Sequence, residues 1–293
     1  MPELPDVTVY CEALAARVRG EVLQRVQVRN PFVLRTAVPP IASAEGKRVR
    51  EVSRLGKRIV LALDDDLFLV IHLMIAGRLR WLDAAAKKPP QHTLAVLEFG
   101  SGRIAFTEAG TKRRASLHLV QGAEALAQFD RGGLEIGDST SADFAGRLRS
   151  ENHTLKRALT DPRLFSGIGN AYSDEILHRA RLPPLKLTRK LAESEIARLF
   201  HATRGVLSEW TERLRAEAGA GFPEKVTAFR PGMAVHGRYG QPCPVCGSPV
   251  QRIVYAENEC NYCAGCQTDG VILADRALSR LLHDSFPRTL DEG

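Results

Sequence analysis

Three regions of this chain have residue types and spacings that suggest chemistry, and the first is its start. Met1 is followed by Pro2 and Glu3. If the initiator methionine is removed, Pro2 becomes a secondary amine that can attack an electrophilic carbon and form an iminium, as lysine does in Schiff-base enzymes. An α-amino group has a reference pKa of about 7.7 to 8.0, so a useful fraction is unprotonated near neutral pH. The alternatives are that Met-Pro is only a common start and that Glu3 merely caps a helix.

The second region contains two Cys-x-x-Cys motifs with sixteen residues between them. Each motif places two thiolates on one edge of a tetrahedron, and strands around residues 250–254 and 258–262 can form a hairpin between the motifs. We therefore expect a zinc ribbon with one structural Zn²⁺; a redox pair and chance spacing are the alternatives. Cys11 and Cys260 are expected to be ordinary buried residues. The expected ligands are Cys243, Cys246, Cys263 and Cys266.

A third stretch combines two glycines and an asparagine immediately before a helix. Glycines on both sides of Ile168 allow close backbone approach, and the amides at the start of the following helix form a ready phosphate site. Asn170 can cap this helix or donate to the same phosphate. The plainer alternative is a tight turn between helices. The residues of this expected phosphate site are Gly167, Ile168, Gly169 and Asn170, with Lys156 on the preceding helix.

Composition limits the scaffold that must position these groups. The 293 residues suffice for two domains with real cores, and 44% hydrophobic with 26% charged residues is usual for a globular chain. We find no run of eighteen apolar residues and no secretory leader pattern, so we expect a cytoplasmic protein without a membrane partner. The net charge is +7, and residues 1–122 carry 19 Lys and Arg against 12 Asp and Glu. This surplus fits a polyanion such as nucleic acid, although a solvated surface would also account for it.

The expected fold class is α+β. Apolar spacing predicts a helix over residues 4–18, ended by Gly20. Short β-rich runs separated by turn signals then predict a β-sandwich or barrel. The expected strands cover residues 22–28, 48–53, 58–63, 67–73, 78–81, 93–99 and 103–106.

Beyond Gly122 the pattern becomes helical. We expect helices over residues 141–148, 151–159, 172–180 and 191–217, the last with an apolar stripe that belongs to the core. The expected domains are a catalytic β-sandwich domain (1–122), a linker (123–137), a helical domain (138–230), the zinc ribbon (231–270) and an amphipathic tail (271–293).

The stretch from Asn152 to Leu177 resembles the helix-two-turn-helix element of the formamidopyrimidine-DNA glycosylase and endonuclease VIII family. The resemblance covers most of the chain, because Pro2-Glu3-Leu4-Pro5, Arg54-Leu-Gly-Lys57, Ile71-His72-Leu73 and the terminal ribbon follow in the family's order. It implies a base-excision-repair enzyme that removes oxidised bases from double-stranded DNA and cleaves the strand at the abasic sugar. A nucleoid-associated monomer is expected.

The resemblance also implies roles for individual residues. Pro2 would attack C1′ of the damaged nucleotide, Glu3 would handle protons at the sugar, and Lys57 would contact phosphate and support elimination. The nucleotide must be rotated out of the stack to reach the amine. Asn170 and the amides of residues 167–169 would hold the backbone. The alternative for Lys57 is a solvated strand-edge lysine.

Several positions depart from the family pattern and bear on base selection. Arg113 and Arg114 are expected to contact DNA, but Ala115 stands where an aromatic wedge is usual, and Met74 or Ile75 could fill the gap. At the ribbon tip, Asn258 replaces the usual phosphate-holding arginine and cannot supply a bidentate charge. The candidates to compensate at the tip are Arg252 and Arg230. At the chain start, Asp6 shortens a carboxylate that is usually glutamate.

Two other functions therefore stay open. One is a DNA-damage or DNA-structure binding protein with weak or no glycosylase activity, and the other is a lyase specific for abasic sites or unusual adducts. We also expect the amphipathic tail to pack against the helical domain through Leu278, Leu281 and Leu282.

Overall fold

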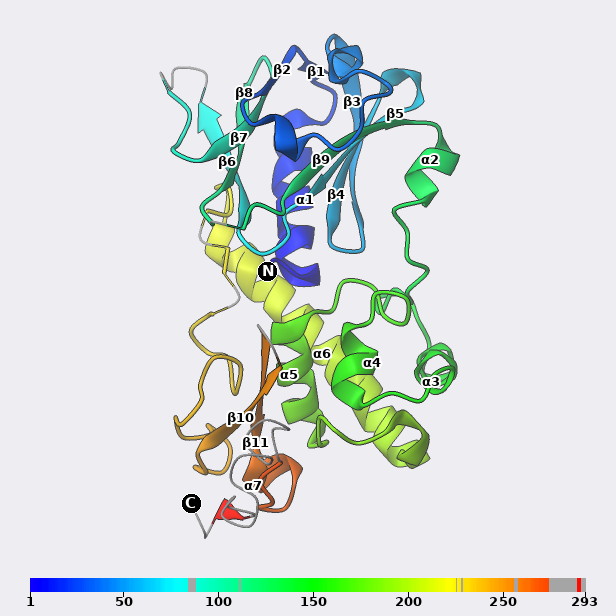
Figure 1. Cartoon of the computed structure of the whole chain (residues 1–293), viewed down its shortest axis with the longest axis vertical. Helices are drawn as coiled ribbons and strands as arrows, with labels where there is room; N and C mark the ends of the chain where they lie inside the picture. Colours follow the sequence, from blue (N-terminus) through cyan, green and yellow to red (C-terminus); the bar gives the residue numbers. More distant parts are fainter. Residues whose placement is uncertain are drawn as a thin grey trace. The chain divides into compact units, whose positions relative to one another are not determined.

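An N-terminal helix and two antiparallel sheets form the first part of the computed structural model (Figure 1). Helix α1 spans Leu4–Val18, as the sequence predicts. Pro5 lies in its first turn, where a missing amide hydrogen costs nothing, and Gly20 adopts φ +86° just beyond its end. The structure describes residues 1–83, 88–110, 112–224, 226–227, 229–255, 258–273 and 289–290.

The strands form a five-stranded sheet of order β1-β3-β4-β5-β9 and a four-stranded sheet of order β2-β7-β8-β6. Side chains from α1 and from both sheets share one buried hydrophobic core, which confirms the predicted β-sandwich. The strands are β1 (Val22–Leu23), β2 (Arg25–Val28), β3 (Lys47–Leu55), β4 (Arg58–Leu63), β5 (Leu67–His72), β6 (Gly77–Asp83), β7 (Thr93–Glu98), β8 (Gly102–Glu108) and β9 (Ser116–Gln121).

Two strand predictions differ from the structure. The strand expected over residues 22–28 is divided at Gln24, because β1 pairs with β3 in one sheet while β2 pairs with β7 in the other. Strand β9 was not predicted, although Leu117 and Leu119 alternate into the core. It pairs with β5 along its whole length and forms one edge of the five-stranded sheet.

Helices and a hairpin make up the later part of the chain. The helix expected from residue 151 begins only at Leu155, because Thr154 is its N-cap residue in an extended conformation and forms a β-bridge with Leu187. The apolar stripe of the longest helix is buried, as predicted, and its Phe200 packs on Phe144 with ring centroids 5.4 Å apart. The elements are α2 (Ala123–Ala127), α3 (Ser141–Arg149), α4 (Leu155–Thr160), α5 (Asn170–Ala180), α6 (Glu193–Ala218), β10 (Val250–Tyr255), β11 (Asn258–Cys263) and α7 (Ala264–Gln267).

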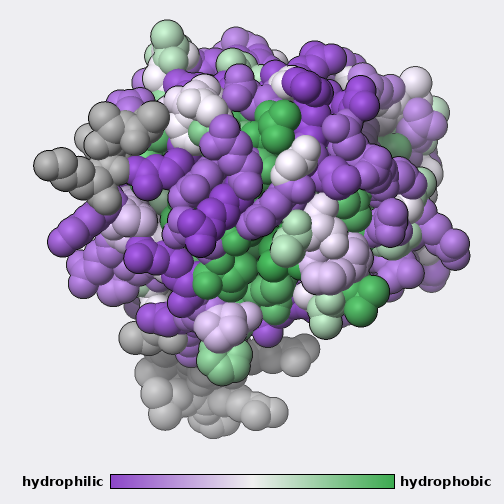
Figure 2. Space-filling view, turned by 90° about the horizontal axis from the view of Figure 1, so that it is seen from above, coloured by the Kyte–Doolittle hydropathy of each residue, from purple (hydrophilic) through white to green (hydrophobic). Residues whose placement is uncertain are grey.

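The chain divides into two compact units. Unit 1 contains residues 1–131 and 209–227, and unit 2 contains residues 132–208 and 228–293. Helix α2 lies within the segment expected as a linker. Among the described residues, none of the helices is both long and apolar enough to cross a membrane. The face drawn in Figure 2 is mainly hydrophilic, with apolar patches between the polar side chains.

The expected amphipathic tail helix, with Leu278, Leu281 and Leu282, lies outside the described residues. Parts of the chain on both sides of it contact the ribbon. Val271 forms a β-bridge with Thr289. Leu273 and Leu290 pack against a buried cluster formed by Ile253, Cys260, Tyr262 and Ala264.

Candidate active site and metal centre

The start of α1 fixes Pro2 and Glu3 in unit 1. Glu3 is the N-cap residue and forms a reciprocal capping box with Asp6, whose Oδ2 accepts a hydrogen bond from the Glu3 backbone N at 2.9 Å. The two carboxylate residues are only 2% and 3% exposed, and Pro2 is buried as well. Glu3 therefore has the capping role weighed as the alternative. The same contacts hold its carboxylate in a fixed position beside the terminal amine.

The electrostatic environment favours a neutral amine at this end of the chain. Burial lowers the pKa of the Met1 amine below its ordinary value of 8.0. The carboxylates of Glu3 and Asp6 oppose this shift, whereas the positive charges of Arg78 and Lys57 add to it. Removal of Met1 would transfer the free amine to the buried Pro2. The same carboxylates and cations would then lie beside the Pro2 nitrogen.

Lys57 is placed by a two-residue turn between β3 and β4. Leu55 pairs with Arg58 across this turn, and Gly56 adopts φ +60°, which suits the first position of a tight hairpin turn. Lys57 is half-buried, and its charge acts on the terminal amine. The hairpin thus brings a cation within electrostatic range of the proposed nucleophile.

Arg78 is a second cation near the amine that sequence reasoning did not single out. Its Nη1 donates to the Gly77 carbonyl at 2.7 Å, and its Nε donates to the Val226 carbonyl. Its charge lowers the pKa of the terminal amine more than the charge of Lys57 does. Nothing local in the sequence distinguishes this strand arginine from its neighbours, because the fold alone brings it near the amine.

The connection between β5 and β6 is a tight turn that carries two apolar residues. The Gly77 backbone N donates to the Leu73 carbonyl at 2.8 Å, and a Cβ on Gly77 would lie only 2.3 Å from that oxygen. Met74 adopts φ +53°, and Ile75 is 53% exposed. The turn therefore carries Met74 and Ile75, the two residues predicted as candidates to fill the gap left by a flipped nucleotide.

The arginine loop after β8 is organised by a buried carboxylate. Glu108 is 1% exposed and accepts hydrogen bonds from the backbone N of Arg114 at 3.0 Å and of Ala115 at 3.2 Å. Arg113 and Arg114 are exposed, whereas Ala115 is 3% exposed and belongs to the core of unit 1. Ala115 thus closes the loop rather than forming its exposed tip.

In unit 2, residues 167–170 form the turn that starts α5. Gly167 adopts φ +78°, a region that favours glycine, and Ile168 is 1% exposed, so its side chain serves the core. Gly169 is the N-cap of α5. The Asn170 side chain donates from Nδ2 to the Glu259 carbonyl on β11 at 2.8 Å. The structure thus brings this turn and the ribbon hairpin together within one unit.

Lys156 is the cation of a buried network. Its Nζ donates to the Asn170 carbonyl at 2.7 Å, to Ser173 Oγ at 2.8 Å and to Asp174 Oδ1 at 2.5 Å, and its side chain is 12% exposed. The other carboxylate oxygen of Asp174 lies 2.8 Å from His236 Nδ1. The ammonium group holds α4 against α5, and the contact with DNA expected from the sequence stays a prediction.

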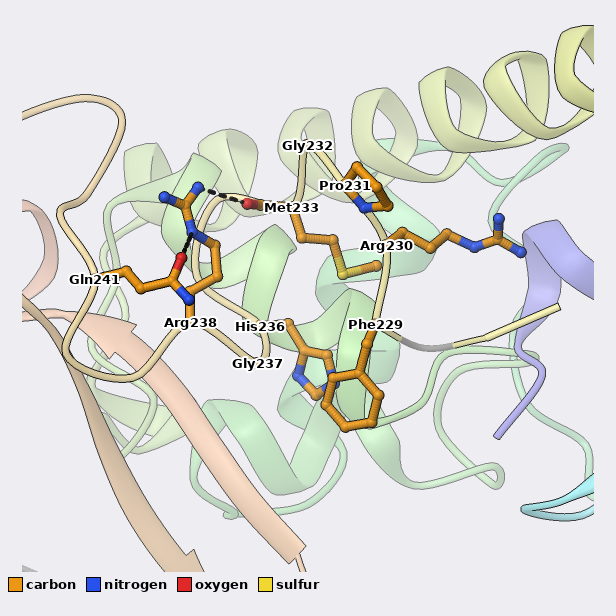
Figure 3. A pocket seen from close by; sticks show the side chains of 9 residues that line it. All are labelled: Phe229, Arg230, Pro231, Gly232, Met233, His236, Gly237, Arg238 and Gln241. Atoms are coloured by element: carbon orange, nitrogen blue, oxygen red, sulfur yellow. Dashed lines mark hydrogen bonds between the residues drawn. The ribbon is translucent and has the colours of Figure 1, made fainter. Parts of the chain in front are cut away.

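Glu175 on α5 holds the backbone of residues 234–236 in place. This residue is 6% exposed and accepts hydrogen bonds from the backbone N of Ala234 at 2.7 Å and of Val235 and His236 at 2.9 Å. The His236 ring lies face to face with Phe229, with centroids 5.6 Å apart (Figure 3). A cavity of about 290 Å³ lies here, lined by Phe229, Arg230, Pro231, Gly232, Met233, His236, Gly237, Arg238 and Gln241.

Asn258 begins β11 and pairs with Tyr255 across the ribbon hairpin. Of the two arginines considered as substitutes for a fingertip cation, Arg252 has its guanidinium 4.2 Å from the centroid of the Tyr239 ring and 3.7 Å from Glu259. Arg252 thus has protein partners on the side of the hairpin.

The paired cysteines converge as their spacing predicts. The Sγ atoms of Cys243 and Cys266 are 3.9 Å apart, and those of Cys246 and Cys263 are 3.3 Å apart. A tetrahedral ion with metal–sulfur bonds of about 2.3 Å requires sulfur atoms about 3.8 Å apart, so the donors present fit a metal ion. His178 on α5 was not foreseen: its Nε2 lies 3.3 Å from Cys243 Sγ.

Family models match both halves of this architecture. A formamidopyrimidine-DNA glycosylase N-terminal domain matches residues 1–114, and a formamidopyrimidine-DNA glycosylase H2TH domain matches residues 136–217. The chain belongs to the formamidopyrimidine-DNA glycosylase family. It is 36% identical over 285 residues to the formamidopyrimidine-DNA glycosylase of Thermus thermophilus, covering 92% of this chain and 100% of that protein. For the Heliobacterium modesticaldum protein of the same name, identity is 33% over 282 residues, with 91% and 100% covered.

Solved structures of this glycosylase family have the same fold. The crystal structure of the MutM (Fpg) protein from Thermus thermophilus matches with a TM-score of 0.76 and 34% identity, covering 91% of this chain and 98% of that one. A Lactococcus lactis variant in complex with a Fapy-dG containing DNA matches with a TM-score of 0.78 and 25% identity, covering 91% and 100%. The family assignment made from the sequence motifs is confirmed.

In this member of the glycosylase family, the residues that stand in short motifs could be identified from the sequence, whereas three residues of α5 that act through distant contacts could not. Asp174, Glu175 and His178 all lie on α5, and each is buried. Two adjacent acids on a helix with an apolar face were the available signal, because buried acids need partners. Their partners lie 18 to 65 positions away along the chain, where no spacing rule reaches.

Proposed function

We propose that the chain excises oxidised bases from double-stranded DNA and then cleaves the strand at the abasic sugar, with the Pro2 amine as the nucleophile. The observation that carries this proposal is the geometry of the chain start, where buried Pro2 lies beside the buried carboxylates of Glu3 and Asp6 and the charge of Lys57 acts on the terminal amine. Family membership supports the same reaction, since relatives of the full length of this chain are formamidopyrimidine-DNA glycosylases.

In the proposed reaction, the nitrogen of Pro2 attacks C1′ of a flipped nucleotide once Met1 has been removed. The N–C1′ bond forms as the bond from C1′ to the base breaks, and the base leaves with the bonding electrons and takes up a proton. The nitrogen loses its proton, Glu3 donates a proton to the sugar ring oxygen, and the C1′–O4′ bond breaks as the iminium between Pro2 and C1′ forms. Loss of a C2′ proton then expels the 3′ phosphate, and a second elimination expels the 5′ phosphate. Lys57 supports these steps as a cation near the phosphates.

Strand holding is assigned to exposed and backbone groups. Arg113 and Arg114 of unit 1 would neutralise phosphates, and the amides of residues 167–169 with Asn170 would bind the backbone from unit 2. Lys156 would act mainly by holding that turn in shape, and Asn258 would contribute a neutral hydrogen bond. Met74 or Ile75 would fill the space of the extruded nucleotide.

For the metal centre, we propose one structural Zn²⁺ on Cys243, Cys246, Cys263 and Cys266. The proposal rests on the sulfur separations given above and on the preference of zinc for four thiolates in ribbons. The ion would stabilise the hairpin of β10 and β11 and takes no part in the bond-breaking steps.

A panel of duplexes, each with one oxidised purine, one oxidised pyrimidine or an abasic site, tests the function. We expect base release and strand cleavage on at least one oxidised base, with strand cleavage impaired in Lys57→Ala. Asn258 at the ribbon tip favours the second candidate, a damage-binding protein without efficient chemistry. Tight binding to these duplexes with neither base release nor cleavage by the wild-type protein would favour it and contradict the enzyme.

A further inference from the structure

Among the residues that the structure describes, the metal centre has five potential donors for an ion that takes four. The donor atoms of His178, Cys243, Cys263 and Cys266 all lie within 4.8 Å of one another. The fifth donor, Cys246, has its Sγ 3.3 Å from that of Cys263. Two overlapping sets can therefore bind a tetrahedral ion, one with four thiolates and one with three thiolates and an imidazole, and both are known for structural zinc.

Burial separates the two competing donors. Cys246 is exposed, whereas Cys243 and Cys263 are buried and Cys266 is half-buried. His178 is 6% exposed and lies in α5, which packs against β11 and α7 of the ribbon. Solvent and thiol reagents therefore reach Cys246 before the other ligands, whereas His178 is shielded from them.

Geometry allows His178 to enter the coordination sphere with little movement. A metal–nitrogen bond of about 2.0 Å and a metal–sulfur bond of about 2.3 Å place the two donor atoms about 3.5 Å apart in a tetrahedron. His178 Nε2 already lies 3.3 Å from Cys243 Sγ. The histidine is therefore at ligand spacing from one thiolate, before any rearrangement.

We propose that His178 is a reserve ligand, which completes a site of three cysteines and one histidine when Cys246 is lost from the ion. With all four cysteines bound, the histidine lies beside Cys243. When the exposed thiolate is removed, Nε2 takes the fourth position and the ribbon keeps its ion. The inference rests on the proposed metal site, and it links the ribbon to α5 of the helical domain.

Zinc content and coordination of purified full-length variants test the proposal. We expect about one zinc per chain in wild type, in Cys246→Ala and in His178→Phe, and a loss of at least tenfold in Cys246→Ala/His178→Phe. His201 on α6 is exposed, so Cys246→Ala/His201→Phe is the matched control and should keep its zinc. Retention of zinc by the Cys246→Ala/His178→Phe variant, or its loss in Cys246→Ala alone, would overturn the reserve role.

X-ray absorption at the zinc edge of Cys246→Ala decides the matter even if the double variant does not fold. We expect three sulfur neighbours, one nitrogen neighbour and the outer-shell scattering of an imidazole ring. A spectrum with three sulfurs and no imidazole scattering would overturn the inference. If wild type itself binds no metal, the metal proposal fails; if wild type binds zinc and Cys246→Ala does not, only the reserve role fails.

Discussion

Replacement of Glu175 by glutamine tests how the helical domain holds the segment that lines the cavity of Figure 3. The carboxylate accepts three backbone hydrogen bonds, with Oε2 facing the N–H of Ala234 and Oε1 facing those of Val235 and His236. Glutamine keeps one acceptor oxygen and turns an NH₂ group toward a third N–H. The substitution therefore removes the charge and leaves two donors facing each other in a buried place.

The cost follows from these contacts. An unsatisfied buried donor costs about 1 to 3 kcal/mol, and the loss of charge weakens the two remaining bonds, each of which is roughly twice as strong with an ionised acceptor. We expect a total of about 3 kcal/mol for local opening of the segment. At about 1.4 kcal/mol per factor of ten, this corresponds to a rise of over 100-fold in the opening equilibrium.

Amide hydrogen exchange measures this quantity at the affected groups. Protection of the amides of Ala234, Val235 and His236 should fall about 100-fold in Glu175→Gln. Glu193→Gln is the matched control, because its carboxylate is 78% exposed and pairs with Arg149 at the surface. It should change the same amides by less than about threefold, since exposed ion pairs contribute less than about 1 kcal/mol. Protection in Glu175→Gln within threefold of wild type would refute the reasoning.

Three further predictions concern charge. Lys156→Met leaves buried Asp174 without its cation, so the free energy of unfolding should fall by about 3 to 5 kcal/mol in denaturant titration. The control is Lys186→Met, because the pair of Lys186 with Glu195 is more exposed. A loss in Lys156→Met no larger than that in the control would contradict the prediction. Burial lowers the pKa of His72 from 6.5 to about 4. The contribution of the neutral imidazole to folding stability is therefore fully present above pH 6.5 and falls as the pH drops toward 4, by at most about 3 kcal/mol. His72→Gln should remove that part of the acid sensitivity, and an unchanged profile of stability against pH would exclude this role of His72. Arg113→Gln/Arg114→Gln should reduce the salt slope of DNA binding by about 2 without lowering the melting temperature, and an unaltered slope would argue against phosphate contacts.

Local rules were sufficient where the signal is local. The bounds of α1 follow from the early proline, the apolar spacing and Gly20, and the hairpin of the ribbon follows from the two Cys-x-x-Cys turns. Each of these elements is specified by residues that are close together in the chain, so propensity and periodicity agree with the final structure.

The remaining features depend on contacts between distant residues. The chain passes from one sheet to the other at Gln24, and the residue types around this position do not predict the break between β1 and β2. Asn170 looked like a phosphate donor from its place before a helix, yet its side chain also meets the carbonyl of Glu259, 89 positions away. Such partners are chosen by packing of the whole unit, which a single sequence pattern does not encode.

Borohydride trapping on DNA that contains an abasic site tests the central claim directly. The reductant converts an iminium between Pro2 and C1′ into a stable amine, which appears as a covalent protein–DNA band. Wild type should form this band. Pro5→Gly, which alters the same helix start but keeps the nucleophile, should still be trapped. Loss of the band in protein whose Pro2 nitrogen is acetylated is the predicted result, because an amide nitrogen cannot form an iminium, and undiminished trapping of that protein would contradict the account.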